Sequence, residues 1–140
     1  MELWKALVDH HREIDTFFTR RDKAHINFTS FLTELLDSKE SKIFIAISEG
    51  KVVGYLIAKI DLFPPIYVME KYGDIYDLIV ESSYRRRSIG SELVKLAVEW
   101  FRSQKIERIE ISVHPYNSSG YSFWKKLGFQ EIFHRLYLNI

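Results

Sequence analysis

The stretch that decides the fold is residues 77–91, which read DLIVESSYRRRSIGS. Its first residues have the apolar character of a short buried strand, and residues 89–101 place their apolar side chains on one face of a helix. A strand that turns directly into a helix exposes the first backbone N–H groups of that helix, which lack intrahelical partners. The helix dipole and the arginines at 85–87 add positive charge, so this turn is suited to bind a phosphate.

Three other interpretations of this turn need consideration. A solvated arginine run, with Gly90 merely easing the start of the helix, would have the same composition. The turn is not a Walker loop, because no Gly-Lys-Ser/Thr follows, and it is not a dinucleotide fingerprint, because it contains a single glycine. The context of strand, turn and helix favours the phosphate site over a bare basic turn.

Hydrophobic periodicity predicts the remaining elements on both sides of this turn. The sequence predicts helices near 3–10, 28–36 and 119–127, a β-hairpin over 42–58, and strands over 75–80, 107–113 and 129–140. A long connection is predicted over 61–73, where two prolines are adjacent. The hairpin is antiparallel, whereas strand-helix-strand order in the second half favours parallel pairing, so we expect a single α/β (α+β) domain over 1–140 with a mixed central sheet flanked by helices.

The composition excludes several kinds of functional site. The chain has 140 residues and no cysteine, so a disulfide, a thiolate zinc site and a cysteine nucleophile are excluded. The five histidines show no metal-ligand spacing, and we expect no metal. No apolar stretch approaches the ~20 residues of a membrane span, and the charged amino terminus does not look like an export signal. We expect a cytoplasmic protein that does not bind membranes.

The charge is nearly balanced overall but uneven along the chain. There are 20 Lys and Arg against 19 Asp and Glu, which argues against a general nucleic-acid-binding surface. Residues 1–83 hold ten basic and fourteen acidic residues, a net of −4, whereas residues 84–140 hold ten and five, a net of +5. The basic half therefore begins at the proposed phosphate-binding turn.

Two motifs resemble those of one family. Residues 85–90 are similar to the acyl-CoA-binding motif of the GNAT superfamily of N-acetyltransferases, Arg/Gln-x-x-Gly-x-Gly/Ala, with Ser88 in the place of the first glycine. Residues 117–129 resemble the second signature of that family, Asn-x-x-Ala-x-x-x-Tyr-x-x-x-Gly-Phe. Both motifs occur in order and at the expected spacing, and the resemblance covers nearly the whole chain.

The resemblance implies an enzyme that uses acetyl-CoA as co-substrate to acetylate a primary amine of a small molecule or a peptide, by direct attack on the thioester. It places the pantetheine arm along the strand edge at 78–80, the pyrophosphate on the N–H groups of 86–91, and Asn117 against the cofactor. The implied cofactor-binding residues are Leu78, Ile79, Val80, Arg85, Arg86, Arg87, Ser88, Ile89, Gly90, Ser91, Asn117, Gly120 and Trp124. A homodimer is also expected.

Three departures from the family pattern affect these expectations. Ser88 stiffens the turn, although its hydroxyl can hydrogen-bond a phosphate. Trp124 stands where the family often has the tyrosine that protonates the leaving thiolate, and Tyr121, one turn earlier, is the remaining candidate. A thiol with a reference pKa of ~8.5 can also take its proton from solvent. Finally, the family usually has a strand before the first helix, and here we expect that strand to be absent.

The acceptor amine must lose a proton before it attacks, and Asp74 and Asp77 are the candidate bases. Strict strand alternation predicts that these two side chains lie on opposite faces. Asp74 is equally compatible with a turn residue beside Gly73, and Asp77 with a hydrogen-bonded structural carboxylate. In the long connection, Phe63, Ile66 and Tyr67 either line the acceptor pocket or cover the core.

Two other functions remain open at this level. A non-catalytic acyl-CoA-binding regulatory or interaction module would explain the tryptophan at 124. A nucleic-acid patch formed by 85–87 with Lys125 and Lys126 would bind phosphate backbones in a salt-sensitive manner, but the near-neutral total charge argues against it.

Overall fold

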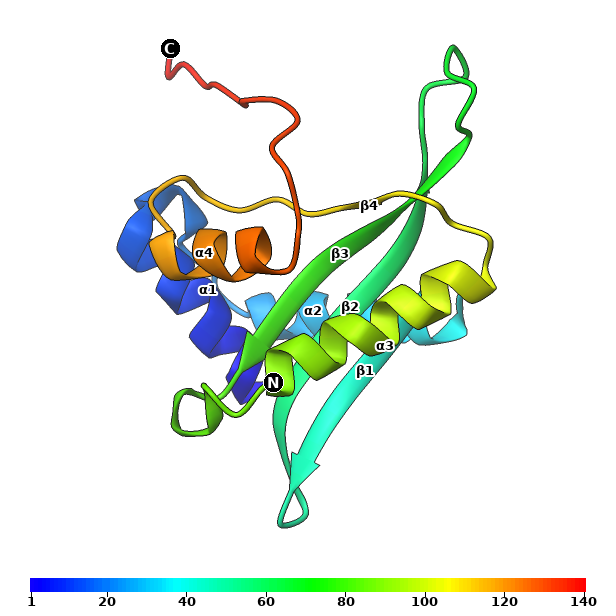
Figure 1. Cartoon of the computed structure of the whole chain (residues 1–140). Coiled ribbons are helices and arrows are strands. Elements are labelled where there is room, and N and C mark those ends of the chain that lie inside the picture. Colours follow the sequence, from blue (N-terminus) through cyan, green and yellow to red (C-terminus); the bar gives the residue numbers. More distant parts are fainter.

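The computed structural model describes all 140 residues as a four-stranded sheet with helices on both faces (Figure 1). None of the helices combines the length and the apolar character needed to span a bilayer. The helices are α1 (Glu2–Ile14), α2 (Ala24–Asp37), α3 (Ile89–Ser103) and α4 (Ser118–Lys126), with short 3-10 turns at Thr16–Phe18 and Ser82–Tyr84; the strands are β1 (Ser41–Ser48), β2 (Lys51–Leu62), β3 (Lys71–Val80) and β4 (Ile109–Glu110).

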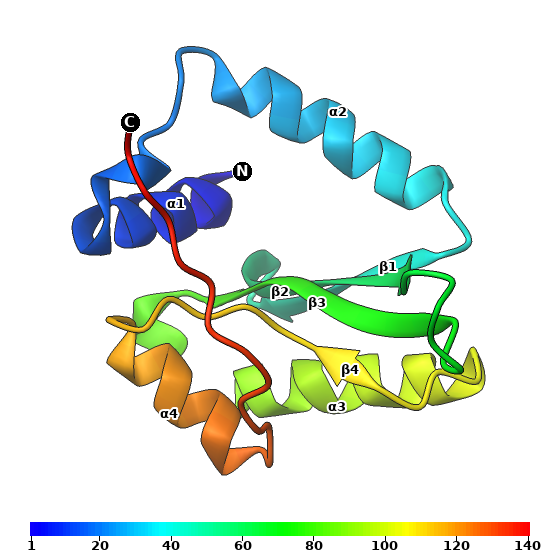
Figure 2. The same cartoon turned by 90° about the horizontal axis from the view of Figure 1, so that it is seen from above.

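The sheet is mixed, as predicted. Its strand order is β1-β2-β3-β4; the first two pairings are antiparallel, and β3 pairs with β4 in parallel. Seen from above, α1 and α2 lie on one face of the sheet and α3 and α4 on the other (Figure 2). The parallel pairing follows from the β3-α3-β4 connection, because a crossover helix returns the chain to the same edge in the same direction.

Each face of the sheet has its own hydrophobic cluster. On the α3 face, Leu56 and Ala58 of β2 pack with Ala97 and Phe101 of α3 and with Trp124 of α4. On the α2 face, a smaller cluster joins residues of β2 and α2, namely Ile57, Phe28 and Leu35. Consecutive residues of β2 therefore serve opposite layers, which is why residues 55–58 read as a continuous apolar run rather than an alternation.

The close contact of β3 with α3 gives a stability prediction. A β-carbon on Gly73 would lie 2.6 to 2.8 Å from the ring of Phe101, which is fully buried. Gly73→Ala should lower the free energy of unfolding by about 1–3 kcal/mol, the usual cost of overpacking a core. Urea denaturation measures the free energy of unfolding of this variant, of Phe101→Leu and of the double variant. Because leucine leaves room for the methyl group, the double variant should lose less stability than the sum of the two single losses. Full additivity of the two losses would contradict the contact.

Strand β3 contains a bulge. Ile57 of β2 pairs with Asp77, whereas its neighbour Ala58 pairs with Ile75, so Tyr76 has no partner on β2. Two residues of a bulged strand oppose one position of the partner, and the alternation of side chains is reset beyond that point.

The bulge corrects one expectation from the sequence. Asp74 pairs with Lys59, and Lys59 lies two residues from Ile57, so both point to the same face of β2. Asp74 and Asp77 therefore share one face, the one covered by α1 and α2, and the prediction of opposite faces was wrong. The extra residue of the bulge accounts for the difference.

Three predicted elements differ from the structure. The predicted strand over 107–113 is reduced to Ile109–Glu110, because β4 has only β3 beside it and diverges from β3 at once. The predicted strand over 129–140 is not formed, since no strand lies beside it, and this tail is exposed. The long connection shrinks to 63–70, because β2 and β3 extend beyond the predicted ends as an antiparallel arm. Ile66 and Tyr67 at its tip are exposed and cover no core.

Candidate active site

The turn between β3 and α3 presents a row of free backbone donors. Arg86 and Ser88 both have positive φ, 60° and 62°, so two residues of the turn have a left-handed backbone, whereas Arg85 before them is extended. None of the backbone N–H groups of residues 86–91 donates a hydrogen bond, and the first donor after them is Glu92, which bonds the Ser88 carbonyl. Free N–H groups in such a turn, followed directly by a helix start, form a nest suited to an anion.

The three arginines of this turn have different roles. Arg85 is engaged by the protein itself, because its Nε donates to the Val80 carbonyl at 3.1 Å. Arg87 lies with its guanidinium carbon 5.1 Å from the centre of the Tyr84 ring. Arg86 is exposed and forms neither a salt bridge nor a side-chain hydrogen bond. Arg86 is therefore the arginine most available to an anion on the nest.

Gly90 and Ser88 mark the start of α3. A β-carbon on Gly90 would touch the Phe123 ring at 3.4 Å, so the helix start packs closely on α4. Ser88 precedes the helix as its N-cap residue without a side-chain capping bond, and its left-handed backbone is the conformation that glycine adopts without a steric cost.

The backbone of Ser88 gives a prediction. Ser88→Gly should raise the free energy of unfolding, or leave it unchanged, because relief of about 1–2 kcal/mol of left-handed strain exceeds or offsets the entropic cost of glycine, about 0.5–1 kcal/mol. Ser83→Gly is the matched control, because Ser83 has no positive φ, and it should only destabilise. Thermal melts of both variants measure the effect. An equal decrease of the melting temperature in the two variants would contradict the left-handed backbone assigned to Ser88.

Next to the turn, an opening separates β3 from β4. The two strands pair only at Gly73 with Ile109 and at Asp74 with Glu110, and β3 then continues to Val80 without a partner on that side. Figure 1 shows the chain after β4 diverging from β3. The side chains of this stretch of β3 are held by the two cores, Leu78 and Val80 on the α3 face and Ile79 on the other. The backbone edge is left free for an extended ligand.

On the α1 and α2 face of this opening lies a carboxylate with a perturbed pKa. Burial raises the pKa of Asp77, the Tyr55 hydroxyl, which donates to Asp77 Oδ2 at 3.3 Å, lowers it, and nearby Asp74 raises it; together these effects put the pKa at about 7. Burial, assisted by Asp61, also raises the pKa of Asp74, which is half-buried. A buried carboxylate that titrates near neutral pH can accept a proton from an amine.

Tyr55 was missed by sequence reasoning. It faces Asp77 because β2 and β3 pair with the register that the bulge imposes, Tyr55 opposite Ile79 and Ile57 opposite Asp77. Burial and the Asp77 carboxylate raise the pKa of Tyr55, which keeps its hydroxyl protonated as a donor. No local signal identifies this pair, since it depends on the position of the bulge.

The residues of the second motif lie on α4. Asn117 caps this helix, accepting a hydrogen bond from the Gly120 N–H at 3.1 Å on Oδ1. A β-carbon on Gly120 would lie 2.6 Å from Asn117 Nδ2, so any larger residue there requires the Asn117 side chain to shift. The side-chain nitrogen Nδ2 of Asn117 donates no hydrogen bond within the chain and is the atom left to contact a ligand.

Tyr121 and Trp124 point to different environments. Trp124 is buried in the main core, with its ring centre 5.1 Å from that of Phe129. The Tyr121 hydroxyl donates to Glu131, which raises the pKa of the phenol and keeps it protonated. The structure thus uses the indole for packing and leaves Tyr121 as the phenol of α4.

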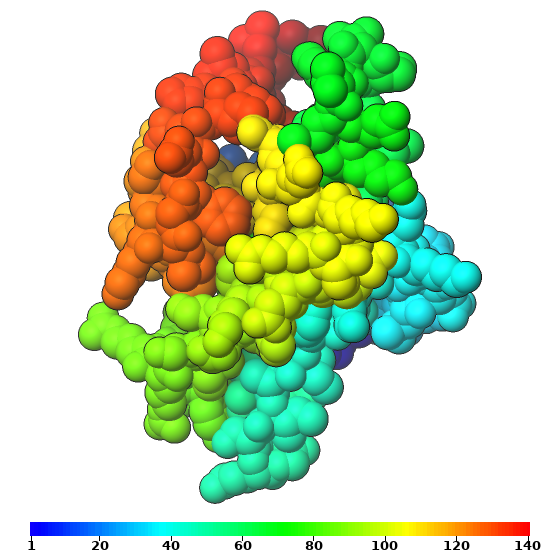
Figure 3. All heavy atoms as spheres, turned by 45° about the vertical axis from the view of Figure 1, so that its right-hand side comes forward, coloured from blue at the N-terminus to red at the C-terminus, as the bar shows by residue number.

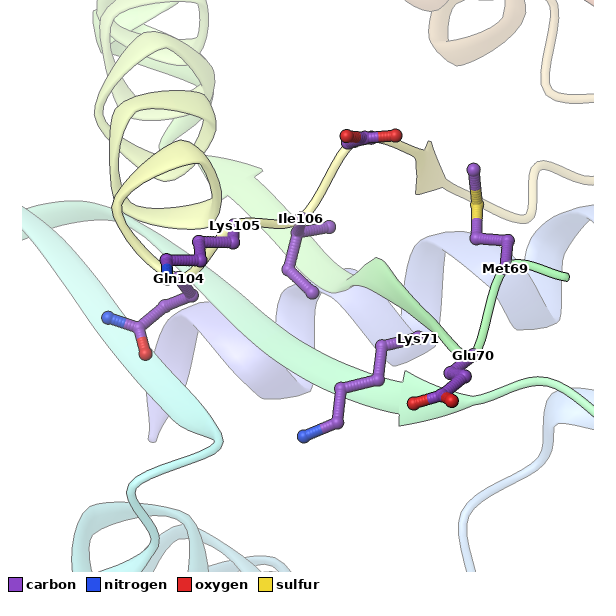
Figure 4. Close-up of a pocket in the computed structure, with 7 residues that line it drawn as sticks. Met69, Glu70, Lys71, Gln104, Lys105 and Ile106 are labelled. Atoms are coloured by element: carbon purple, nitrogen blue, oxygen red, sulfur yellow. The ribbon is translucent and has the colours of Figure 1, made fainter.

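A hollow of about 320 Å³ lies away from this site. It is formed where the loop before β3 faces the turn after α3, between Glu70 and Lys71 on one side and Lys105 and Ile106 on the other (Figure 4). The nest follows the other end of β3. The candidate active site is therefore the opening between strands rather than this hollow.

Solved structures share this fold. A tetramutant of a Bacillus halodurans protein aligns with a TM-score of 0.86 at 19% identity, covering 99% of this chain and 90% of that one. An aminoglycoside N-acetyltransferase in complex with CoA aligns with a TM-score of 0.72 at 18% identity, covering 81% of this chain and 86% of that one. At these identities the likeness concerns the fold alone.

Sequence comparison identifies the family. An N-alpha-acetyltransferase of Sulfurisphaera tokodaii is 29% identical over 107 residues, which are 73% of this chain and 64% of that protein. The chain spans less than two thirds of the length of the curated relatives that it matches first. The sequence model of the Acetyltransferase (GNAT) family matches residues 4–129. The chain therefore belongs to the GNAT family of acetyltransferases, as its two motifs indicated.

Proposed function

We propose that residues 1–140 form one domain that transfers an acetyl group from acetyl-CoA to a primary amine. The observation that carries the proposal is the row of free N–H groups at 86–91, placed directly beside the unpaired edge of β3 and the perturbed carboxylate of Asp77. The nest would bind the pyrophosphate, the free edge of β3 would bind the pantetheine arm, and Asp77 would accept a proton from the amine. No observation favours the non-catalytic alternative.

The chain's own groups then have defined tasks. Acetyl-CoA supplies an activated thioester, whose carbonyl carbon the amine nitrogen attacks. Asp77 takes a proton from the incoming ammonium, since an alkylamine has a pKa near ~10.4 and is otherwise charged. A backbone N–H on the free edge of β3 is placed to donate to the carbonyl oxygen as it gains negative charge. As the C–S bond breaks, Tyr121, which stays protonated, or solvent gives a proton to the departing thiolate, and the new amide nitrogen loses its second proton to solvent.

The relatives indicate which amines to test. One is named an N-alpha-acetyltransferase, which points to the α-amine of a peptide, and a structural neighbour is an aminoglycoside N-acetyltransferase, which points to a small polyamine. Asp74 lies near Asp77 and has Asp61 and Glu110 near it in turn, and this acidic group favours a cationic acceptor. We also propose a cytoplasmic location, with no requirement for a metal.

A panel of peptides and aminoglycosides tests the proposal by mass spectrometry. With acetyl-CoA, at least one amine should gain the mass of one acetyl group, and the product should be absent without protein. Acetyl-CoA should also raise the melting temperature, because a ligand that binds only the folded state stabilises it. The absence of any melting shift at millimolar acetyl-CoA would refute the proposal.

Tyr55 provides a prediction about pH. Its hydrogen bond lowers the pKa of Asp77, so Tyr55→Phe should move the pKa of Asp77 above about 7. The acidic limb of the profile of kcat/KM against pH should shift to higher pH, while the plateau at high pH is retained. Tyr76→Phe is the matched control, because the Tyr76 hydroxyl makes no hydrogen bond to Asp77. An unshifted limb would mean that Tyr55 has no part in tuning the base.

A further inference from the structure

The first helix, α1, is held to the rest of the molecule by few contacts. None of its residues is buried. At its start, the Trp4 ring stacks on Phe28 of α2, with the ring centres 4.3 Å apart. At its end, Asp15 Oδ2 lies 3.5 Å from Nε2 of His114, which follows β4. No other hydrogen bond or ion pair joins residues 2–18 to the sheet, to α3 or to α4.

The Asp15 carboxylate is oriented by its own surroundings. Asp15 ends α1 as its C-cap residue, and its Oδ1 accepts the Phe17 N–H at 2.9 Å, which caps the 3-10 turn that follows. Phe18 of that turn meets the His114 ring edge to face, with the ring centres 6.3 Å apart. One carboxylate oxygen is therefore used by the cap, and the other is directed at His114.

His114 organises the turn that leads into α4. Its Nδ1 accepts the Tyr116 N–H at 3.2 Å, so the proton of the neutral ring is on Nε2, the nitrogen that faces Asp15. The His114 carbonyl accepts the Asn117 N–H at 2.9 Å. His114 thus contacts the end of α1 with its ring and holds the N-cap residue of α4 with its backbone.

These contacts connect the two sides of the opening between β3 and β4. The chain after β4 is held to β3 by a two-residue ladder and to the main core by the side chains of Ile111 and Val113. Figure 3 shows blue atoms of the amino-terminal region behind the gap between the yellow segment that contains β4 and the orange segment that contains α4. Asp77 lies on the α1 side of this opening and Asn117 begins α4, so His114 joins the acceptor side to the cofactor side.

We propose that His114 is a positioning residue, which through its contact with Asp15 holds Asn117 in the direction that binds CoA. The inference rests on the proposed function, because Asn117 Nδ2 is the free donor that CoA would meet. His114 itself makes no hydrogen bond or ion pair with the nest or with Asp77. A donor that is already held in its binding direction loses less conformational freedom when the ligand binds, so the contact raises CoA affinity.

Asp15→Asn breaks the contact and retains the cap. The amide oxygen keeps the bond to the Phe17 N–H, whereas the amide nitrogen takes the place of Oδ2 and puts a donor opposite the His114 N–H. The Kd of CoA from isothermal titration should rise about 3- to 10-fold, and so should KM for acetyl-CoA. The kcat at saturating acetyl-CoA should stay within about twofold, because the lost interaction is one of binding.

Asp9→Asn is the matched control. It removes an ion pair of the same helix, in which Asp9 Oδ1 lies 2.9 Å from Arg20, and this pair does not involve His114. The Kd of CoA should not change. Asp15 and His114 are both partly exposed, so their variants keep the fold, which circular dichroism verifies.

Two substitutions of His114 separate the contact with Asp15 from the local turn. His114→Gln carries its amide nitrogen about as far out as Nε2, so it still donates to Asp15 but loses the acceptor of the Tyr116 N–H. His114→Asn keeps an acceptor near the position of Nδ1 and is too short to reach Asp15. The glutamine variant should bind CoA within about threefold of the wild type, and the asparagine variant should lose as much affinity as Asp15→Asn.

The double variant Asp15→Asn, His114→Asn completes the test. It should lose no more CoA affinity than either single variant, because both changes break the same contact. Four results would each overturn the inference while the wild type binds CoA: an unchanged Kd in Asp15→Asn, an equal loss in Asp9→Asn, additive losses in the double variant, or a loss in His114→Gln that His114→Asn does not show. A wild type that binds no CoA would refute the proposed function, and this inference with it.

Discussion

Asp77→Asn is expected to reduce kcat/KM for an amine acceptor by at least ~100-fold, since a positioned general base typically contributes ~10²–10⁴ in rate. Asparagine keeps the size and the hydrogen bond to Tyr55 but cannot accept a proton from the ammonium. In the wild type, kcat/KM should rise with pH through about 7, where the carboxylate becomes ionised, and then level off. In the variant, kcat/KM should not show this rise with pH. Steady-state kinetics from pH 5 to 9 measure both effects.

The same substitution should change stability in the opposite direction. The pKa of Asp77 is raised from 3.8 to about 7 in the folded state, so the protonated form stabilises the fold at low pH, and this contribution is lost as pH rises toward about 7. At pH 8 the wild type carries a buried charge that asparagine lacks. Asp77→Asn should therefore be more stable than the wild type at pH 8 by a few kcal/mol, and show little gain at pH 4.

Asp74→Asn separates the two carboxylates. Asp74 is half-buried and raises the pKa of Asp77 by its charge, so its removal should move the acidic limb to lower pH and retain most of the plateau rate. If Asp74→Asn abolished turnover and Asp77→Asn did not, the base would be Asp74 and the assignment above would be wrong.

Arg86→Glu is expected to weaken CoA binding by at least ~100-fold, about 2.7 kcal/mol. The substitution removes the arginine that has no partner in the chain and places a negative charge beside the nest of free N–H groups. A negative side chain there competes with the pyrophosphate for the same donors. Isothermal titration with CoA measures the loss, which should decrease as salt is added.

Arg102→Glu is the matched control for this experiment. It makes the same change of charge on an exposed position of α3, but in the last turn rather than before the first. The eleven helical steps from Ser91 to Arg102 span roughly 16 Å of helix, beyond the ~8–10 Å screening length at physiological salt. CoA affinity should change less than threefold, on the order of 0.6 kcal/mol. Equal losses in both variants would indicate a general charge effect and not a nest.

Local features of the sequence predicted much of the site. The turn at 85–91 was predictable because a strand, a basic turn and an amphipathic helix follow one another, and each is a short-range pattern. Residues 117–129 were likewise recognisable as a motif, but the motif did not reveal that Asn117 caps α4. The individual roles of the three arginines could not be predicted from the sequence. The Val80 carbonyl and the Tyr84 ring, which contact Arg85 and Arg87, are placed by the tertiary structure.

The carboxylate pair shows where sequence reasoning stops. Alternation placed Asp74 and Asp77 on opposite faces, and one unpaired residue, Tyr76, reversed that result. A bulge is set by the pairing of two distant strands, so residue order alone does not reveal it. The pair of Tyr55 with Asp77 depends on the same register and was missed for the same reason.

The tail illustrates a different limit. Its alternation correctly marks residues with strand character, but a strand needs a neighbour, and within one chain none lies beside 130–140. Trp124 is similar, since its place in the motif suggested a contact with the cofactor whereas the fold uses it in the core. The sequence pattern indicates which secondary structure a segment can form. Tertiary packing determines which other residues the segment contacts.

The central claim is that the nest at 86–91 holds the pyrophosphate of CoA beside the free edge of β3. Titration of CoA into ¹⁵N-labelled protein, followed by amide chemical shifts and hydrogen exchange, tests it directly. We expect the amide chemical shifts of residues 86–91 to change most and these amides to become protected from exchange, because they are free donors in the unliganded chain. CoA binding that leaves these six amides unshifted and unprotected would contradict it.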